Sequence, residues 1–294
     1  MSEEAIARIK GLPCWQHLVS VEPLSGGMTN LNYRVQDGDN TYVVRLGDSM
    51  PEHLLWRENE GTVSQTAADC GFSPRVVHRE QGLLVIDFIE GHVFTESDVR
   101  QPDNIKRLVP LLRRFHQQMP QKFDGYPVIF WVFQVLRHYC NMLQQADSPH
   151  CRRVAEFEEI SARLEKDVGP VDIVFGHNDL LAANFIDDGD KIWLIDFDYA
   201  GFNSPLFDLA NLASNSEFDE ADERMMLEQY FAEPLQQDRW KSYRAMKCAS
   251  LLREAMWSMV SESYSRIDFD YGGYTRENDR RFTDAYADYR AVFG

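Results

Sequence analysis

The sequence lacks long apolar runs and paired cysteines, and both absences limit what the protein can be. No stretch of the 294 residues approaches the roughly 20 apolar residues that a membrane helix needs. The beginning of the chain, MSEEAIARIKGLPCW, is acidic and mixed, so we expect no signal peptide. The cysteines favour reduced cytoplasmic thiols over disulfides or a metal site, because they are odd in number, scattered and without a C-x-x-C pair: Cys14, Cys70, Cys140, Cys151 and Cys248. We therefore predict a cytoplasmic protein.

Positive charge is also scarce, with a formal net charge of −17. An acidic surface repels nucleic acids and anionic membranes, so we expect neither as a partner. The charge is compatible with a cationic small substrate, although most acidic surfaces only confer solubility. With 44% hydrophobic residues, the chain can form one large domain or two tightly coupled lobes.

The first 90 residues are rich in strand patterns. Strand-like runs at 19–24, 31–35 and 41–46 are separated by the turn-type clusters SGGMTN and DGDN, which predicts an antiparallel meander. Further strands are expected at 76–77 and 83–88, and helices at 2–10 and 52–70.

The remainder is mostly helical in pattern. Helices are expected at 105–115, which Pro110 should kink or split, and at 130–143, 154–164, 221–231, 240–264 and 277–293. A β-rich part followed by a helical part predicts a bilobal α+β molecule, with an N-terminal nucleotide-binding lobe at 1–90 and a helical lobe at 91–294.

The segment 174–208 places polar side chains at the ends of two short strands. The run Ile173 to Phe175 predicts a buried strand, which Gly176 breaks into a polar loop containing Asp179. Asn184 follows, and a second strand at 192–195 ends in Asp196. A rigid sheet can aim such groups at one point.

These residue types suit phosphoryl transfer. The Asp196 carboxylate and the Asn184 amide oxygen make part of a Mg²⁺ shell, which waters and phosphate oxygens complete. Asp179 is then free to accept a proton from an incoming hydroxyl. Asp and Asn are common turn residues, but the combination of Asp179, Asn184 and Asp196 at this spacing is more specific for such a site than any one of them alone. We predict a phosphotransferase site.

The segment resembles the catalytic core of the choline/ethanolamine kinase branch of the aminoglycoside-phosphotransferase-like family, which shares the protein-kinase fold. The resemblance runs from about Leu24 to Phe282 and implies a small antiparallel β N-lobe, a larger helical C-lobe, and ATP with Mg²⁺ between them. It implies Asp179 as the catalytic base, and Asn184 and Asp196 as metal ligands. His177 is expected to pack and hydrogen-bond inside the loop, and Asp208 to begin a helix and tie the loop down.

The resemblance also implies the nucleotide site. A Gly-Gly turn alone is more often an ordinary hairpin, but here Gly26, Gly27 and Asn30 match a loop that covers the phosphates. Arg45 and Glu60 match the cation–acid pair that grips phosphates; the alternative is a surface ion pair. Adenine would bond the backbone of Asp87 and Ile89, an expectation that rests on the resemblance alone.

The acceptor pocket is expected in the C-terminal part. Aromatic faces attract quaternary ammonium groups, and Trp257 and Tyr274 match family positions that line the cation; alternatively they are core aromatics. A second family tryptophan is Glu254 here, and an acid expected near position 215 is an amide. We expect the nearby acids to complete the amine site: Asp198, Glu217 and Glu254.

Together these features predict an ATP- and Mg²⁺-dependent phosphotransferase for the hydroxyl of a small amino alcohol, choline or ethanolamine first. The alternatives are a related kinase for thiamine, a sugar or an aminoglycoside, and a non-catalytic nucleotide-binding protein. The joint presence of Asp179, Asn184 and Asp196 speaks against the last. A homodimer is left open.

Overall fold

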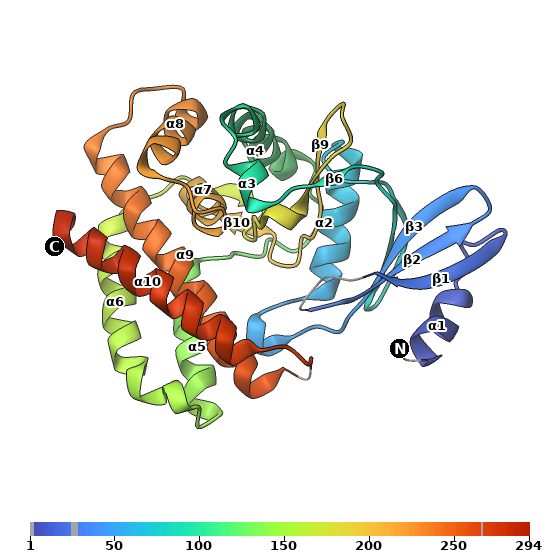
Figure 1. Ribbon diagram of the computed structural model, residues 1–294, viewed down its shortest axis with the longest axis horizontal. Coiled ribbons are helices and arrows are strands. Elements are labelled where there is room, and N and C mark those ends of the chain that lie inside the picture. Colours follow the sequence, from blue (N-terminus) through green and yellow to red (C-terminus); the bar gives the residue numbers. More distant parts are fainter. Residues whose placement is uncertain (1–2, 25–28, 266) are drawn as a thin grey trace.

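A computed structural model describes residues 3–24, 29–265 and 267–294. It has two parts, a twisted sheet with α1 at one end and a larger assembly of helices at the other (Figure 1). Gly26 and Gly27, for which we expect a phosphate-covering loop, lie outside the described residues.

The N-terminal part is an antiparallel five-stranded sheet in the order β1-β2-β3-β5-β4. The strands alternate between buried and exposed side chains, and one face packs with Ile9 of the first helix around a small core. Asp37 pairs with Asn40 across the DGDN turn, where Gly38 has a φ of 59° that favours glycine. The predicted meander is confirmed, and the elements are α1 (Glu3–Lys10), β1 (Leu18–Leu24), β2 (Leu31–Asp37), β3 (Asn40–Leu46), β4 (Val76–Glu80) and β5 (Leu83–Asp87).

The helix expected at 52–70 is wrong in its first turn. A short 3₁₀ turn, η1 (Pro51–His53), ends where Leu54 adopts the left-handed region with a φ of 58°, and α2 (Arg57–Asp69) begins after it. Val63 and Ala67 of α2 belong to the core of the helical part, not to that of the sheet. The division of the chain at residue 90 therefore stays a prediction.

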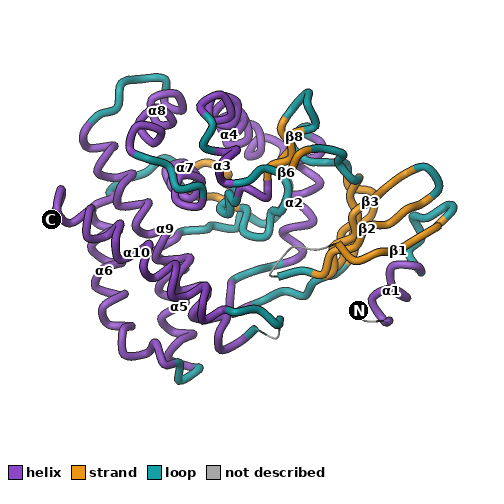
Figure 2. Tube along the Cα trace, viewed as in Figure 1, coloured by secondary structure: helices purple, strands orange, loops and turns teal. Residues whose placement is uncertain are grey.

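Helices make up most of the C-terminal part, as Figure 2 shows. Pro110 does not split its helix, because α4 continues through it with this proline on the exposed face. The last helix begins at Tyr271, six residues before the predicted start, because Asp270 caps it by accepting from Gly273 N at 2.8 Å. Among the described residues, no helix is long and apolar enough to cross a membrane. The helices are α3 (Glu96–Val99), α4 (Pro102–Lys122), α5 (Val132–Gln145), η2 (Pro149–Arg153), α6 (Val154–Val168), α7 (Pro205–Asn215), α8 (Glu220–Phe231), α9 (Gln237–Tyr264) and α10 (Tyr271–Phe293).

Two small sheets frame the segment with the predicted catalytic residues. The first pairs β7 (Val174–Gly176) with β10 (Gly201–Asn203), and the second has the order β6-β8-β9, with β6 at His92–Val93, β8 at Phe185–Asp187 and β9 at Ile192–Leu194. Ile173 is 61% exposed and precedes β7, so its prediction as a buried strand residue is wrong. Asn184 ends the turn η3 (Ala182–Asn184), and its carbonyl accepts from Ile195 N at 3.1 Å, next to Asp196.

Candidate active site

A buried carboxylate on α7 holds the loop that carries Asp179. Asp208 accepts hydrogen bonds from the backbone N–H groups of His177 and Asn178, both at 2.7 Å. The His177 ring is buried, and its Nε2 lies 3.0 Å from the Ile195 carbonyl oxygen. Two expectations for this loop are confirmed: His177 packs and hydrogen-bonds, and Asp208 ties the loop down. The expectation that Asp208 begins a helix is wrong, because α7 begins at Pro205 with Ser204 as its cap, and Asp208 lies within its first turn.

Asp179 has an environment suited to proton transfer. Its side chain is 15% exposed, and Arg253 Nη1 lies 3.4 Å from Oδ1. Burial raises the pKa of Asp179 to about 7; the nearby carboxylates of Glu254 and Asp196 also raise it, while Arg253 opposes them. A carboxyl with a pKa near neutrality can exchange a proton at physiological pH.

Asn184 and Asp196 lie beside this base. Asn184 Nδ2 donates to the Asp179 carbonyl oxygen at 2.9 Å, so Oδ1 is the amide atom left for a ligand. Asp196 has a φ of 68°, a left-handed conformation that costs roughly 1–2 kcal/mol for a residue with a Cβ. Burial alone would raise the pKa of Asp196, but the Arg45 guanidinium holds it below its ordinary value. A carboxylate and an amide oxygen form a donor set that fits Mg²⁺, which keeps several non-protein ligands.

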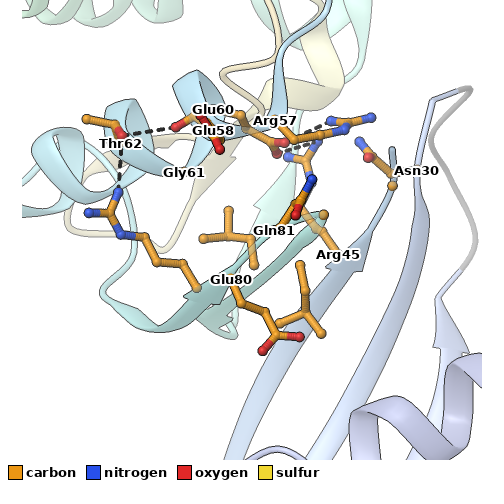
Figure 3. A pocket seen from close by; sticks show the side chains of 14 residues that line it. Asn30, Arg45, Arg57, Glu58, Glu60, Gly61, Thr62, Glu80 and Gln81 are labelled. Atoms are coloured by element: carbon orange, nitrogen blue, oxygen red, sulfur yellow. Dashed lines mark hydrogen bonds and ion pairs between the residues drawn. The ribbon is translucent and has the colours of Figure 1, made fainter. Parts of the chain in front are cut away.

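A buried ion-pair network adjoins Asp196, and Figure 3 shows three of its members, Arg45, Arg57 and Glu60. Arg45 Nη2 lies 2.8 Å from Asp196, 3.2 Å from Glu60 and 3.3 Å from Asp198. Arg57 Nη1 lies 2.8 Å from Glu60 and 2.5 Å from Asp198. The three carboxylates could together hold a cation, but two guanidinium groups already lie among them.

Asp198 belongs to this network. Its side chain is 3% exposed, and it also accepts from the Thr29 hydroxyl at 2.9 Å and from Asn30 Nδ2 at 3.5 Å. The structure thus places Asp198 and Asn30 together, beside Arg57. Asp198 contacts Arg45 and Arg57, and a role of Asp198 in binding the amine stays a prediction.

A cavity of about 370 Å³ connects the predicted nucleotide residues with the metal residues. The Asp87 carboxylate is turned to Arg75, with Oδ1 at 2.9 Å from Nη2, and the Asp87 N–H donates to the Arg75 carbonyl oxygen at 3.0 Å, which leaves the Asp87 carbonyl oxygen for adenine. Arg45 also lines a cavity of about 350 Å³ with Arg57 and Glu60, but its lining includes neither Asn184 nor Asp196. The larger cavity is lined mainly by apolar side chains, together with Arg45, Asp87, Ile89, Asn184 and Asp196.

Three of the predicted acceptor residues come together on α9 and α10. The Tyr274 hydroxyl donates to Glu254 Oε1 at 2.7 Å, and the rings of Trp257 and Tyr274 lie 6.3 Å apart, edge to face. Trp257 Nε1 donates to the Tyr199 hydroxyl at 3.0 Å. Glu217 is not part of this group, because its side chain is 65% exposed and lies 3.7 Å from Arg100.

Sequence reasoning missed two arginines of this site. Arg57 precedes Glu60 by three residues on one helix, a spacing that could have suggested an ion pair. Arg253 carried no such signal, because it lies 74 residues from Asp179 in the sequence and lies within a largely apolar stretch of α9.

A small antiparallel sheet joined to a helical part defines a protein-kinase-like fold, and its cavity is lined by a cation, an amide and a carboxylate. The family model of choline/ethanolamine kinase matches residues 21–247. The chain therefore belongs to the choline/ethanolamine kinase family, and it is a kinase that acts on an alcohol group.

The relatives agree with this assignment. The chain is 27% identical to a probable ethanolamine kinase of Arabidopsis thaliana over 291 residues, covering 87% of this chain and 77% of the relative. It is 25% identical to probable choline kinase 2 of the same plant over 301 residues, covering 90% and 85%. The fold matches the crystal structure of the choline kinase LicA from Streptococcus pneumoniae with a TM-score of 0.78 at 23% identity, covering 97% and 100%.

Proposed function

We propose that the protein transfers the γ-phosphoryl group of ATP to the hydroxyl of a small amino alcohol, ethanolamine or choline, in a Mg²⁺-dependent reaction. The observation that carries the proposal is the position of Asn184. Its side chain bonds the backbone of Asp179, its carbonyl bonds the residue before Asp196, and it lines the cavity that we assign to the nucleotide.

In the proposed reaction the hydroxyl oxygen attacks the γ-phosphorus, the bond to the bridging oxygen of ADP breaks, and Asp179 accepts the hydroxyl proton. Asn184 and Asp196 would hold Mg²⁺, which neutralises phosphate charge. Arg45 is held by Glu60 at 3.2 Å and presents its cation to the phosphates. Trp257, Tyr274 and Glu254 surround the amine.

The nucleotide would bind in the cavity next to β5 and β8. Its apolar side chains suit adenine, and the backbone of Asp87 and Ile89 would read the base edge. The covering role of Gly26 and Gly27 remains a prediction for residues outside the described ranges. We place the reaction in the cytoplasm, in keeping with five free cysteines.

The test is a panel of acceptors assayed for ADP release with Mg-ATP: ethanolamine, choline, thiamine, a sugar and an aminoglycoside. We expect ADP with ethanolamine or choline and none above the water background with the others. Preferential turnover of thiamine, a sugar or an aminoglycoside would replace the amino alcohol. Tight nucleotide binding without turnover of any acceptor would show a non-catalytic protein.

A further inference from the structure

We call the predicted acceptor residues Glu254, Trp257 and Tyr274, with the neighbouring Asp179, Tyr199 and Arg253, the acceptor group. It contains a buried cation as well as two carboxylates. Arg253 Nη1 lies 2.9 Å from Glu254 Oε2 and 3.4 Å from Asp179 Oδ1, so one guanidinium joins the proposed base to the proposed amine ligand. With Asp179 ionised, as a base must be, two carboxylates and one guanidinium leave one net negative charge at this place. That surplus matches an acceptor with a single positive charge.

The two carboxylates are more exposed than the arginine. The side chains of Asp179 and Glu254 are 15% and 10% exposed, whereas that of Arg253 is 2% exposed. Arg253 Nε and Nη2 are buried and have no hydrogen-bond partner among the described residues. We therefore expect Arg253 to make no contact with the acceptor and to fix the positions of the two carboxylates.

Two of the aromatic rings near this site already have another side chain over one face. The Arg253 guanidinium lies 4.5 Å from the centre of the Tyr199 ring, and the His53 ring lies 5.0 Å from that of Trp257 at an angle of 31°. Trp257 and Tyr199 are 4% and 6% exposed, close to the 7% of Glu254 on the same whole-residue scale. A quaternary ammonium depends on open ring faces because it has no N–H to donate, and one face of each of these two rings is already occupied.

Glu254 offers a different kind of contact. Tyr274 and Arg253 each occupy one of its oxygens and hold its orientation, while the other lone pairs of these oxygens can still accept hydrogen bonds. A charge-assisted bond from an ammonium N–H to a carboxylate is stronger than a bond between neutral groups. A trimethylammonium group would cover this carboxylate without donating a hydrogen bond to it.

We propose that the Arg253–Glu254 pair makes the acceptor site select an ammonium group that carries N–H bonds, a primary amine first, over a quaternary ammonium. The inference rests on the proposed function and names the acceptor class of the same site. Arg253 is a positioning residue in this account, and Glu254 is the ligand of the amine.

The experiment is a series with one hydroxyl and increasing methylation: ethanolamine, its N-methyl and N,N-dimethyl derivatives, and choline. We expect kcat/KM to fall along the series, with ethanolamine at least tenfold above choline and most of the change in KM. An equal or higher kcat/KM for choline overturns the selectivity and leaves the proposed function standing. Absence of phosphorylation for all four amines refutes the proposed function itself.

The variant Glu254→Gln keeps the size of the side chain and an oxygen for Tyr274 but removes the charge. It should lower kcat/KM for ethanolamine about tenfold, change that for choline less than twofold, and leave the KM of ATP unchanged. Glu262→Gln, on the same helix but paired with His150, is the matched control. A preference for ethanolamine that survives Glu254→Gln contradicts the assignment.

Arg253→Lys and Arg253→Met separate positioning from folding. Lysine keeps the cation and should retain most of the preference, while methionine should lose it. A melting temperature for each variant identifies those that fold. A folded Arg253→Met variant with the wild-type preference for ethanolamine would show that Arg253 has no part in selectivity.

Discussion

Asp179 combines a rigid backbone with a side chain whose surroundings oppose its ionisation. Its loop is held by Asp208 and Asn184, while burial and two neighbouring carboxylates raise its pKa to about 7. Arg253 counteracts this effect at 3.4 Å. Such a group accepts a proton from the substrate more readily than an ordinary surface aspartate, whose pKa lies near 4.

Replacing Asp179 by asparagine tests its role. Asp179→Asn keeps the shape but cannot take a proton, so kcat should fall by about 10³-fold, within the range for loss of a general base. Binding of Mg-ATP, measured by calorimetry, should change less than twofold. Asp190→Asn, in an exposed turn, is the control. Near wild-type turnover by the Asp179 variant would remove this residue from the chemistry.

At the scale of elements, α7 joins the catalytic loop to two other helices. Asp208 Oδ2 lies 2.9 Å from His116 Nε2 on α4, and His116 Nδ1 lies 2.7 Å from the Tyr230 hydroxyl on α8. All three residues are buried. Loop position therefore depends on a chain of hydrogen bonds through the helical core.

This chain predicts a pH-dependent contribution to stability. Burial alone would raise the pKa of Asp208, but hydrogen bonds from His116 and the loop backbone hold it below its ordinary value of 3.8. A carboxylate whose pKa is lower in the folded than in the unfolded state stabilises the fold at any pH above its unfolded pKa. This stabilisation is lost as the pH falls through the folded pKa. Asp208→Asn should thus cost about 3 kcal/mol at pH 7.

The measurement is urea unfolding of the wild type and Asp208→Asn at several pH values. The difference in unfolding free energy should shrink as pH drops below about 4, since only the wild type loses a charge-assisted network there. Asp124→Asn, an exposed substitution, should show no such trend. A difference that stays constant with pH would contradict the role of the Asp208 charge.

Elements whose signals are local could be predicted from the sequence. Alternation and turn residues located β1 to β5, and the spacing of polar residues around Asp179 located the catalytic loop. Boundaries set by backbone geometry could not be predicted. Leu54 ends the 3₁₀ turn before α2 by adopting a positive φ, so α2 begins later than expected. Asp270 caps α10 although two glycines lie in the first turn of that helix. Leu54 belongs to no pattern that marks a boundary, while Asp270 is a residue type that caps helices but is followed closely by two glycines, which disfavour a helix.

At the scale of the whole molecule, the site is assembled from both parts of the chain. Arg45 on β3 reaches Asp196 across 151 residues of sequence, and Arg57 on α2 reaches Asp198 across 141. The grouping of Asp179, Asn184 and Asp196 could be predicted because these residue types, at this spacing, suit phosphoryl transfer. Arg57, Arg253 and the contacts of Asp198 could not, because they depend on distant contacts that only the folded chain defines.

The central claim is that Asn184 and Asp196 hold the metal at the nucleotide. The most direct test is a crystal structure with Mn²⁺ and ADP, in which anomalous scattering locates the ion. We predict a peak about 2.1 Å from Asn184 Oδ1 and an Asp196 carboxylate oxygen, in contact with ADP phosphate oxygens. An ion bound instead between Glu60 and Asp198, or no ion near Asn184, would contradict the account.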